Sequence, residues 1–271
     1  MELSWDNVLL AFALTLFAGL STGIGSAIAF LTKKTNKKFL SLSLGFSAGV
    51  MIYVSFVEIF PTAQETLRES YSEKIADVIV AISFFAGMGL IAIIDKLIPS
   101  YENPHEVISV ECMENNQPHD KKLMRMGIFS ALAIGIHNFP EGLATFIAGL
   151  SNPEIAYPIA FAIAIHNIPE GIAVSVPIFF ATGSRKKAFK LSFLSGLSEP
   201  LGAIIGFFLI YTFIGINSVI LGILFALVAG IMIFISLDEL LPTAKEYGAH
   251  HLSIYGLVAG MVLMAFSLLL F

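Results

Sequence analysis

The phrases HNFPEG (residues 137–142) and HNIPEG (residues 166–171) repeat one pattern inside two long apolar segments. Residues three and four apart lie on one face of a helix, so each phrase places its histidine and its glutamate together. Each phrase also contains a proline, Pro140 or Pro169, which removes one backbone hydrogen bond and frees the carbonyl four residues earlier. At membrane depth such a carbonyl is tolerated where it faces protein or a polar cavity. Two helices are therefore predicted to present imidazole, carboxylate, amide and carbonyl groups to a common space, as in a metal site.

The composition is that of a membrane protein. Of the 271 residues, 56% are hydrophobic and only 13% are charged, and the mean hydropathy is +0.85. A soluble domain contains about 25% charged residues. The first residues lack the basic stretch of a secretory signal, so the first apolar segment is expected to remain as a membrane span. The single cysteine, Cys112, lies in a polar segment and is expected to be an idle thiol rather than a ligand.

Eight apolar segments are long enough to cross the hydrocarbon core, which takes about 20 residues each. They lie near residues 8–31, 39–61, 75–98, 123–149, 155–181, 188–214, 218–241 and 252–271. The connections are short except for residues 99–122, which we predict to be a cytoplasmic loop. The sequence thus predicts an all-α integral membrane protein with eight transmembrane helices, forming one transporter domain over residues 1–271.

Lysine and arginine predict the orientation, because they concentrate in cytoplasmic loops. Of the 15 such residues, all but Arg68 and Lys74 lie in or beside the first, third, fifth and seventh connections. These connections share one side of the membrane, which is therefore the cytoplasmic side. We expect both termini to lie outside, and the protein to be a multi-pass protein of the cell inner (plasma) membrane.

The chain also repeats itself in opposite directions. GLSTGIG at 19–25 resembles GLSEPLG at 196–202, and EIFPTA at 58–63 resembles ELLPTA at 239–244. The partners are five spans apart, so they cross the membrane with opposite polarity. Spans one to three are predicted to form an inverted repeat with spans six to eight, around a hairpin of spans four and five. Such repeats are typical of secondary transporters, whose sites lie near the bilayer midplane.

The candidate metal-binding residues gather at this depth. At about 1.5 Å of rise per residue, the two histidines, Thr22 and Glu199 all fall near the middle of the bilayer. Three buried carboxylates with no basic partner among them must either hold protons or bind a divalent cation. A hydrogen-bonding link between helices would explain one such histidine, but explains two identical phrases poorly. The set is His137, Asn138, Glu141, His166, Asn167, Glu170 and Glu199.

The donor types narrow the choice of ion. Imidazole mixed with carboxylate suits Zn²⁺, Fe²⁺, Co²⁺ and Mn²⁺, whereas the absence of thiolate disfavours Cu(I) and two imidazoles disfavour Mg²⁺ and Ca²⁺. Seven groups exceed the four that a tetrahedral zinc site needs, so two adjacent ions bridged by Glu141 and Glu170 are allowed. Further acids, Glu58 near the outer end of span two and Asp238 and Glu239 near the inner end of span seven, are predicted to line vestibules.

At these residues the chain resembles the ZIP (Zrt/Irt-like) family of divalent-metal transporters, most of all its bacterial zinc-uptake branch. The resemblance covers all eight spans and is carried by both HNxPEG phrases, by GLSEPLG and by the E-x-x-P phrases of spans two and seven. It implies uptake of Zn²⁺, and with broad selectivity of Fe²⁺, Mn²⁺ and Co²⁺, into the cytoplasm. It also implies a homodimer, and an elevator motion of spans one, four, five and six against the others.

The resemblance further implies how the site is divided. A first metal site would consist of His137, Glu141, His166 and Glu170. A second would consist of Asn138, Asn167 and Glu199, sharing the two bridging glutamates. The metal would be the transported substrate, the other partners would be membrane lipid and a second copy of the chain, and no nucleic acid is expected.

Two further histidine pairs have a plainer interpretation. Many eukaryotic members of the family have a long His-rich loop between spans three and four, but residues 99–122 contain only His105 and His119. A solvated connector is therefore favoured over a metal-sensing loop. His250 and His251 are expected in an interfacial loop, with a weak exit site as the alternative.

The alternative function is a membrane-bound di-metal carboxylate oxidoreductase. Such sites usually have the order Glu-x-x-His on their helices, whereas this chain has His-x-x-x-Glu. An inverted repeat also serves no purpose in an oxidase, and a metal receptor would need an output domain that the sequence lacks. The sequence therefore favours a transporter and not an enzyme.

Overall fold

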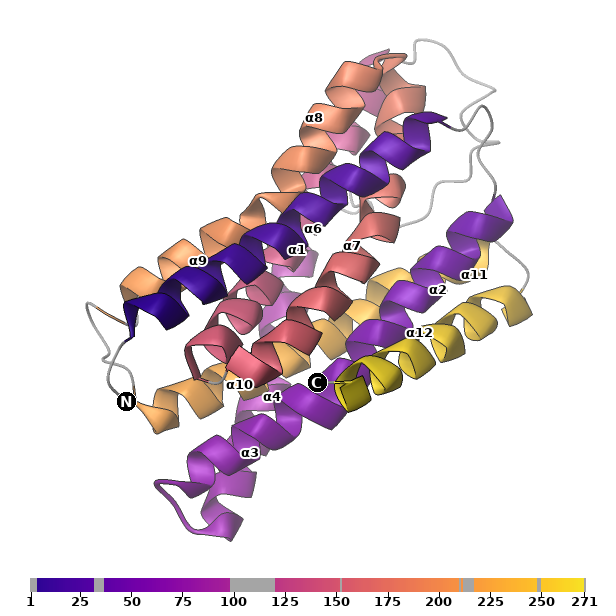
Figure 1. Ribbon diagram of the computed structural model, residues 1–271. Helices are drawn as coiled ribbons and strands as arrows, with labels where there is room; N and C mark the ends of the chain where they lie inside the picture. The colour runs from indigo at the N-terminus through magenta and orange to yellow at the C-terminus, as the bar shows by residue number, and fades with distance from the viewer. Residues whose placement is uncertain are drawn as a thin grey trace.

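The computed structural model describes residues 4–31, 37–97, 120–151, 153–209, 211, 217–247 and 250–270. These residues form helices and short turns, and no strand occurs among them (Figure 1). Most of the predicted cytoplasmic loop, with Cys112, His105 and His119, lies outside the described residues. The prediction of an all-helical protein is thus confirmed for the part of the chain that is described.

The helices follow one another in the order of the predicted spans. They are α1 (Trp5–Leu31), α2 (Lys37–Val54), the π-helix η1 (Ser55–Ile59), α3 (Phe60–Arg68), α4 (Glu73–Leu97), α6 (Asp120–Ser151) and α7 (Pro153–Thr182). After these come α8 (Arg185–Gly196), α9 (Ser198–Leu209), α10 (Ser218–Ile235), the π-helix η4 (Ser236–Leu240), α11 (Leu241–Tyr247) and α12 (His250–Leu270). His250 and His251 were predicted in a loop, and this was wrong, because they form the first turn of α12.

Six helical stretches in the described residues are long and apolar enough to cross a membrane. They are Trp5–Ile28, Lys38–Arg68, Glu73–Lys96, Arg185–Phe208, Ser218–Glu246 and His251–Leu269, which match predicted spans one, two, three, six, seven and eight. The predicted spans four and five correspond to α6 and α7, continuous helices of 32 and 30 residues. Several membrane-spanning helices are therefore confirmed, and the total of eight stays a prediction.

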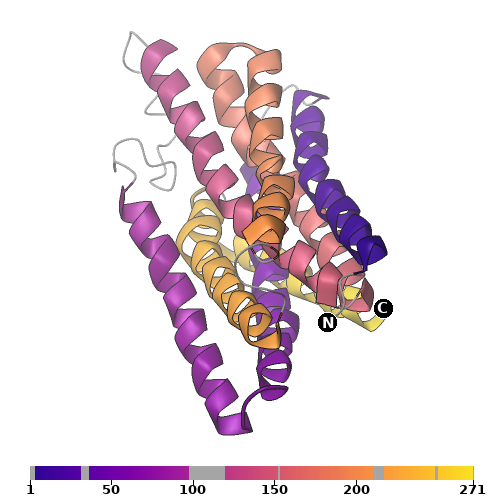
Figure 2. The ribbon, with the colours of Figure 1, turned by 90° about the vertical axis from the view of Figure 1, so that its left-hand side faces the viewer.

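The helices form one bundle, with α1, α8 and α9 along one side and α2, α11 and α12 along another (Figure 1). Helix α7 packs against α1, α2, α6 and α8, so it lies in the interior. The start of α1 and the end of α12 lie toward the same end of the bundle in Figure 2. An even number of spans requires both ends of the chain to lie on the same side of the membrane, as they do here. Which side of the membrane this end faces stays a prediction.

Glycines allow the helix backbones to approach closely. A Cβ atom added at Gly25 or Gly171 would lie less than 3.0 Å from a backbone carbonyl across the α1–α7 contact, and the same holds at Gly142 and Gly202 across the α6–α9 contact. Small residues at such positions are the usual means of packing helices in membranes, where apolar side chains gain nothing by leaving lipid. These contacts hold together the backbones of the four helices that carry the HNxPEG phrases and the GLSTGIG and GLSEPLG phrases.

Both E-x-x-P phrases begin in a π-helix. The five residues SFVEI form η1 and the five residues SLDEL form η4. The amide of Phe60 bonds to the carbonyl of Ser55, and the amide of Leu241 bonds to that of Ser236, five residues back in each case. The next residue is proline, which has no N–H to donate, so the preceding turn can widen.

Candidate metal centre

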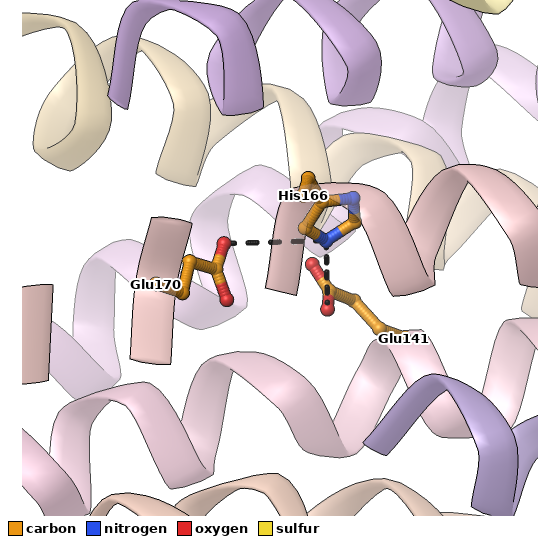
Figure 3. Close-up of side chains that lie close together, drawn as sticks. All are labelled: Glu141, His166 and Glu170. Atoms are coloured by element: carbon orange, nitrogen blue, oxygen red, sulfur yellow. Dashed lines mark hydrogen bonds and ion pairs between the residues drawn. The ribbon is translucent and has the colours of Figure 1, made fainter. Parts of the chain in front are cut away.

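Glu141, His166 and Glu170 form a buried cluster between α6 and α7. Their ligand atoms lie within 4.8 Å of one another, and each residue is at most 1% exposed. His166 Nε2 lies 3.3 Å from Glu141 Oε2 and 4.0 Å from Glu170 Oε1. Figure 3 shows both carboxylates directed toward this one ring nitrogen. Two oxygens and one nitrogen thus converge on a space where a metal ion could bind.

The local sequence explains this convergence. His166 and Glu170 are four residues apart on α7, so they share a face as predicted. Helix α6 continues through Pro140, and α7 continues through Pro169. The two prolines therefore disturb backbone bonding only locally, and the helical spacing of each phrase is kept. Glu141 reaches the cluster from α6, which packs directly against α7.

A second polar group lies beside the cluster. The Nδ2 of Asn167 donates to Glu199 Oε1 and also to the backbone carbonyl of Ala18, at 2.9 Å from that oxygen. All three residues are fully buried. The predicted span six is divided at Leu197, so Glu199 lies in the first turn of α9. Backbone bonds from the amide of Leu197 to the carbonyl of Phe193 and from the amide of Leu201 to that of Leu197 carry the helix past this point, so α8 and α9 form one span.

Some buried polar atoms find no hydrogen-bond partner in the described part of the chain. Among them are the side-chain oxygen and nitrogen of Asn138, the Oδ1 of Asn167, and the hydroxyls of Thr22, Ser55 and Ser267. Burying such an atom unpaired costs about 1–3 kcal/mol. The oxygens of Asn138, Asn167 and Thr22 are ligands that a divalent cation could use, so the residues present fit a metal site.

The structure thus brings together five of the seven predicted ligands on three helices, in two adjoining groups, and places a sixth, Asn138, as a buried amide on α6. The seventh, His137, is on α6 next to Asn138, but its side chain lies outside the described residues. Whether it faces the cluster stays a prediction. The predicted vestibule acids are the fourth residue of η1, Glu58, and two residues of η4, Asp238 and Glu239; their role likewise stays a prediction.

One residue in contact with the cluster was missed. Ser47, on α2, places its hydroxyl 3.3 Å from Glu170 Oε1 and 3.5 Å from the backbone carbonyl of His166. It belongs to none of the repeated phrases, and serine is common in apolar helices. A polar position on the buried face of α2 was the only signal available in the sequence.

The comparisons with known proteins agree with this geometry. The model of the family described as ZIP Zinc transporter matches residues 4–95 and 95–268. The chain belongs to this family. It is 65% identical over 266 residues to "Zinc transporter ZupT" of Streptococcus mutans, covering 98% of this chain and 99% of that protein. It is 63% identical over 279 residues to the protein of that name from Clostridium perfringens (98% and 97% covered) and 64% identical over 270 residues to that from Chlorobium chlorochromatii (98% and 99%).

Family membership confirms several predictions. The resemblance read from the repeated phrases is confirmed, and so is a multi-pass protein of the cell membrane. The family is one of transporters and not of enzymes, so metal is cargo here rather than a resident cofactor. The alternative of a di-metal oxidoreductase gains no support from any relative described above.

Proposed function

We propose that this protein takes up Zn²⁺ into the cytoplasm through the buried site on α6, α7 and α9. The observation that carries the proposal is the convergence of Glu141, His166 and Glu170 within 4.8 Å. One imidazole with two carboxylates is a donor set that zinc accepts, and Fe²⁺, Mn²⁺ and Co²⁺ accept it as well. Residues 126–184 contain no lysine or arginine. A divalent cation bound between the two carboxylates would offset their negative charge.

The site holds two ions in this proposal. The first is bound by His137, Glu141, His166 and Glu170, and the second by Asn138, Asn167 and Glu199 together with the two glutamates. The contact between Asn167 and Glu199 supports the second group, as do the buried amide atoms of Asn138 that lack partners among the described residues. Glu58, Asp238 and Glu239 line the approaches on the two sides.

The fold in this proposal has eight spans related by an inverted repeat, with both termini outside and two copies forming a dimer in the lipid. Matching helix contacts support the repeat. Gly25 meets the backbone of Ile168 and Gly202 meets that of Phe139, while Gly171 meets Thr22 and Gly142 meets Glu199. Each pair occupies equivalent positions of the repeated phrases, and the two π-helices are equivalent in the same way.

Uptake of radiolabelled zinc into proteoliposomes tests the function directly. We expect saturable uptake that unlabelled Fe²⁺, Mn²⁺ and Co²⁺ reduce, and imposed pH and voltage gradients identify the driving force. Zinc accumulation no faster than in protein-free liposomes, at confirmed incorporation, would reject the proposal. Oxygen consumption by the purified iron-loaded protein would instead revive the oxidoreductase.

Replacing Glu199 by alanine is expected to change selectivity more than zinc flux. Zinc can be bound by four groups of the first site, whereas Mn²⁺ and Fe²⁺ prefer more oxygen ligands and a higher coordination number. The measurement is the ratio of zinc to manganese uptake in the variant and in the native protein. A loss of all metals to the same extent would show that the site is not divided in two.

Acidification should weaken metal capture. Metal binds neutral imidazole and ionised carboxylate, so protons compete for the same atoms, and the apparent zinc affinity should fall as the pH decreases from about 7 to about 5.5. The measurement is the apparent KM at several pH values, with equal pH on both sides and the membrane potential clamped, which removes any proton gradient as a driving force. An affinity independent of pH over that range would contradict the assigned donors.

A further inference from the structure

The hydroxyl of Ser47 is a contact that α2 makes with the metal cluster. It lies 3.3 Å from Glu170 Oε1, and Ser47 is fully buried. The sequence separation is 123 residues, so only the tertiary fold brings the two together. Glu170 Oε1 is also the oxygen that lies 4.0 Å from His166 Nε2. Ser47 therefore contacts the same atom that would share an ion with the imidazole.

The hydroxyl has two acceptors within reach. Besides Glu170 Oε1, the backbone carbonyl of His166 lies 3.5 Å away. A hydroxyl has one proton, and a hydrogen bond to an ionised carboxylate is stronger than one to a neutral carbonyl. The carboxylate is also the nearer of the two. The proton thus goes to Glu170, and a carboxylate oxygen that accepts it still has a lone pair for a metal ion.

Backbone packing fixes where this hydroxyl lies. Gly45 and Gly49 flank Ser47 at two residues on either side, and a Cβ at either glycine would lie less than 3.0 Å from a carbonyl oxygen of α12, at Ser253 or at Leu257. Two residues correspond to about 200° around a helix. Ser47 therefore points away from α12 and toward α7. Close backbone contacts with α12 fix the position of α2, and so they fix the position from which the Ser47 hydroxyl contacts Glu170.

We propose that Ser47 is a positioning residue for the metal ligand Glu170: its hydroxyl orients that carboxylate for the ion and so sets metal affinity. This inference rests on the proposed function of the site. The offset between the two E-x-x-P phrases places Val228 of α10, which is buried and has no donor, at the repeat position of Ser47. The hydroxyl is therefore a feature of one half of the repeat only, and it distinguishes the two sides of the site.

Four serine variants of the full-length protein test this role, each assayed for Zn²⁺ binding in detergent and for uptake in proteoliposomes. Loss of a partner that orients a metal ligand lowers affinity about 10–100-fold. We expect that loss in Ser47→Ala and in Ser47→Val, whose side chain has no donor and has the shape of threonine. Ser47→Thr retains the hydroxyl and should bind within about threefold of the native protein. The matched control is Ser41→Ala, since Ser41 is a fully buried serine of α2 that donates to Ala244 of α11, outside the site.

A double variant separates positioning from packing. If Ser47 acts through the carboxylate, Ser47→Ala should cause no further loss of zinc affinity in a protein that already carries Glu170→Ala. Equal affinities of Ser47→Ala and Ser41→Ala would overturn the inference, as would an undiminished effect in the Glu170→Ala background. If Ser47→Ala does not fold, Ser47→Val replaces it in both comparisons. Native protein that neither binds nor transports zinc would reject the proposed function instead, so the two failures are distinct.

Discussion

Zinc uptake is expected to fall to the protein-free background when His166 or Glu170 is replaced by alanine. Both residues face the same space, and His166 Nε2 lies within 4.0 Å of carboxylate oxygens from two helices. Replacing a residue that only hydrogen-bonds to a metal ligand already lowers metal affinity about 10–100-fold. Removal of the ligand itself should exceed that, because the cluster consists of only three imidazole or carboxylate ligands among the described residues.

The control for this experiment is Glu65→Ala, which removes an exposed carboxylate from α3. It should transport zinc at the native rate. All variants are compared at equal amounts in the membrane and with equal thermal stability in detergent, so that loss of transport is not loss of protein. His137→Ala is included because the same loss is expected if that residue completes the first site. Native uptake by His166→Ala or Glu170→Ala would reject the assignment of the cluster.

The helices and the cluster could be predicted because their causes are local. An apolar segment of about 20 residues forms a spanning helix whatever surrounds it, and a spacing of four places His166 beside Glu170 in any helix. The meeting of Glu141 with His166 is not local, since these residues are 25 apart and on different helices. It could be predicted only because both helices carry the same phrase and must bury the same charges.

Other features depend on backbone irregularities and helix packing that a local sequence pattern does not determine. The single turn residue Leu197, two positions before Glu199, lies inside an apolar segment whose sequence gives no sign of an irregularity there. The two π-helices depend on how the turn before Pro61 or Pro242 rearranges, and proline permits several outcomes there. Ser47 could not be identified because its contact with α7 arises only when α2 is packed against α12.

Replacing Gly142 by alanine is expected to impair folding and transport severely. A Cβ at this position would lie less than 3.0 Å from the O, C and Cα atoms of Glu199. These are backbone atoms of a helix, so no side chain can turn aside, and α6 and α9 must separate. Overpacking costs about 1–3 kcal/mol and occasionally more, which exceeds the roughly 1 kcal/mol that alanine gains over glycine in a helix.

The matched control is Gly89→Ala on α4, where a Cβ would meet nothing within 4 Å. That variant should keep native uptake and melt at the same or a slightly higher temperature, because only the helix preference acts there. The comparison uses thermal unfolding in detergent together with zinc uptake. For Gly142→Ala, a native melting temperature and native uptake would contradict the prediction, because they would show that α6 and α9 accommodate the added Cβ without loss.

The two measurements also distinguish packing from chemistry. Glu141 on α6 and Glu199 on α9 each contact a residue of α7, so separation of α6 from α9 must displace at least one of them from His166 or Asn167. Any Gly142→Ala protein that does fold should therefore bind zinc more weakly, although every ligand is still present. Gly171 is the repeat equivalent of Gly142, and a Cβ at Gly171 would contact the backbone of Thr22 on α1. Gly171→Ala should therefore behave in the same way. Weak folding with unchanged zinc affinity would mean that this close approach supports the bundle but does not determine the geometry of the site.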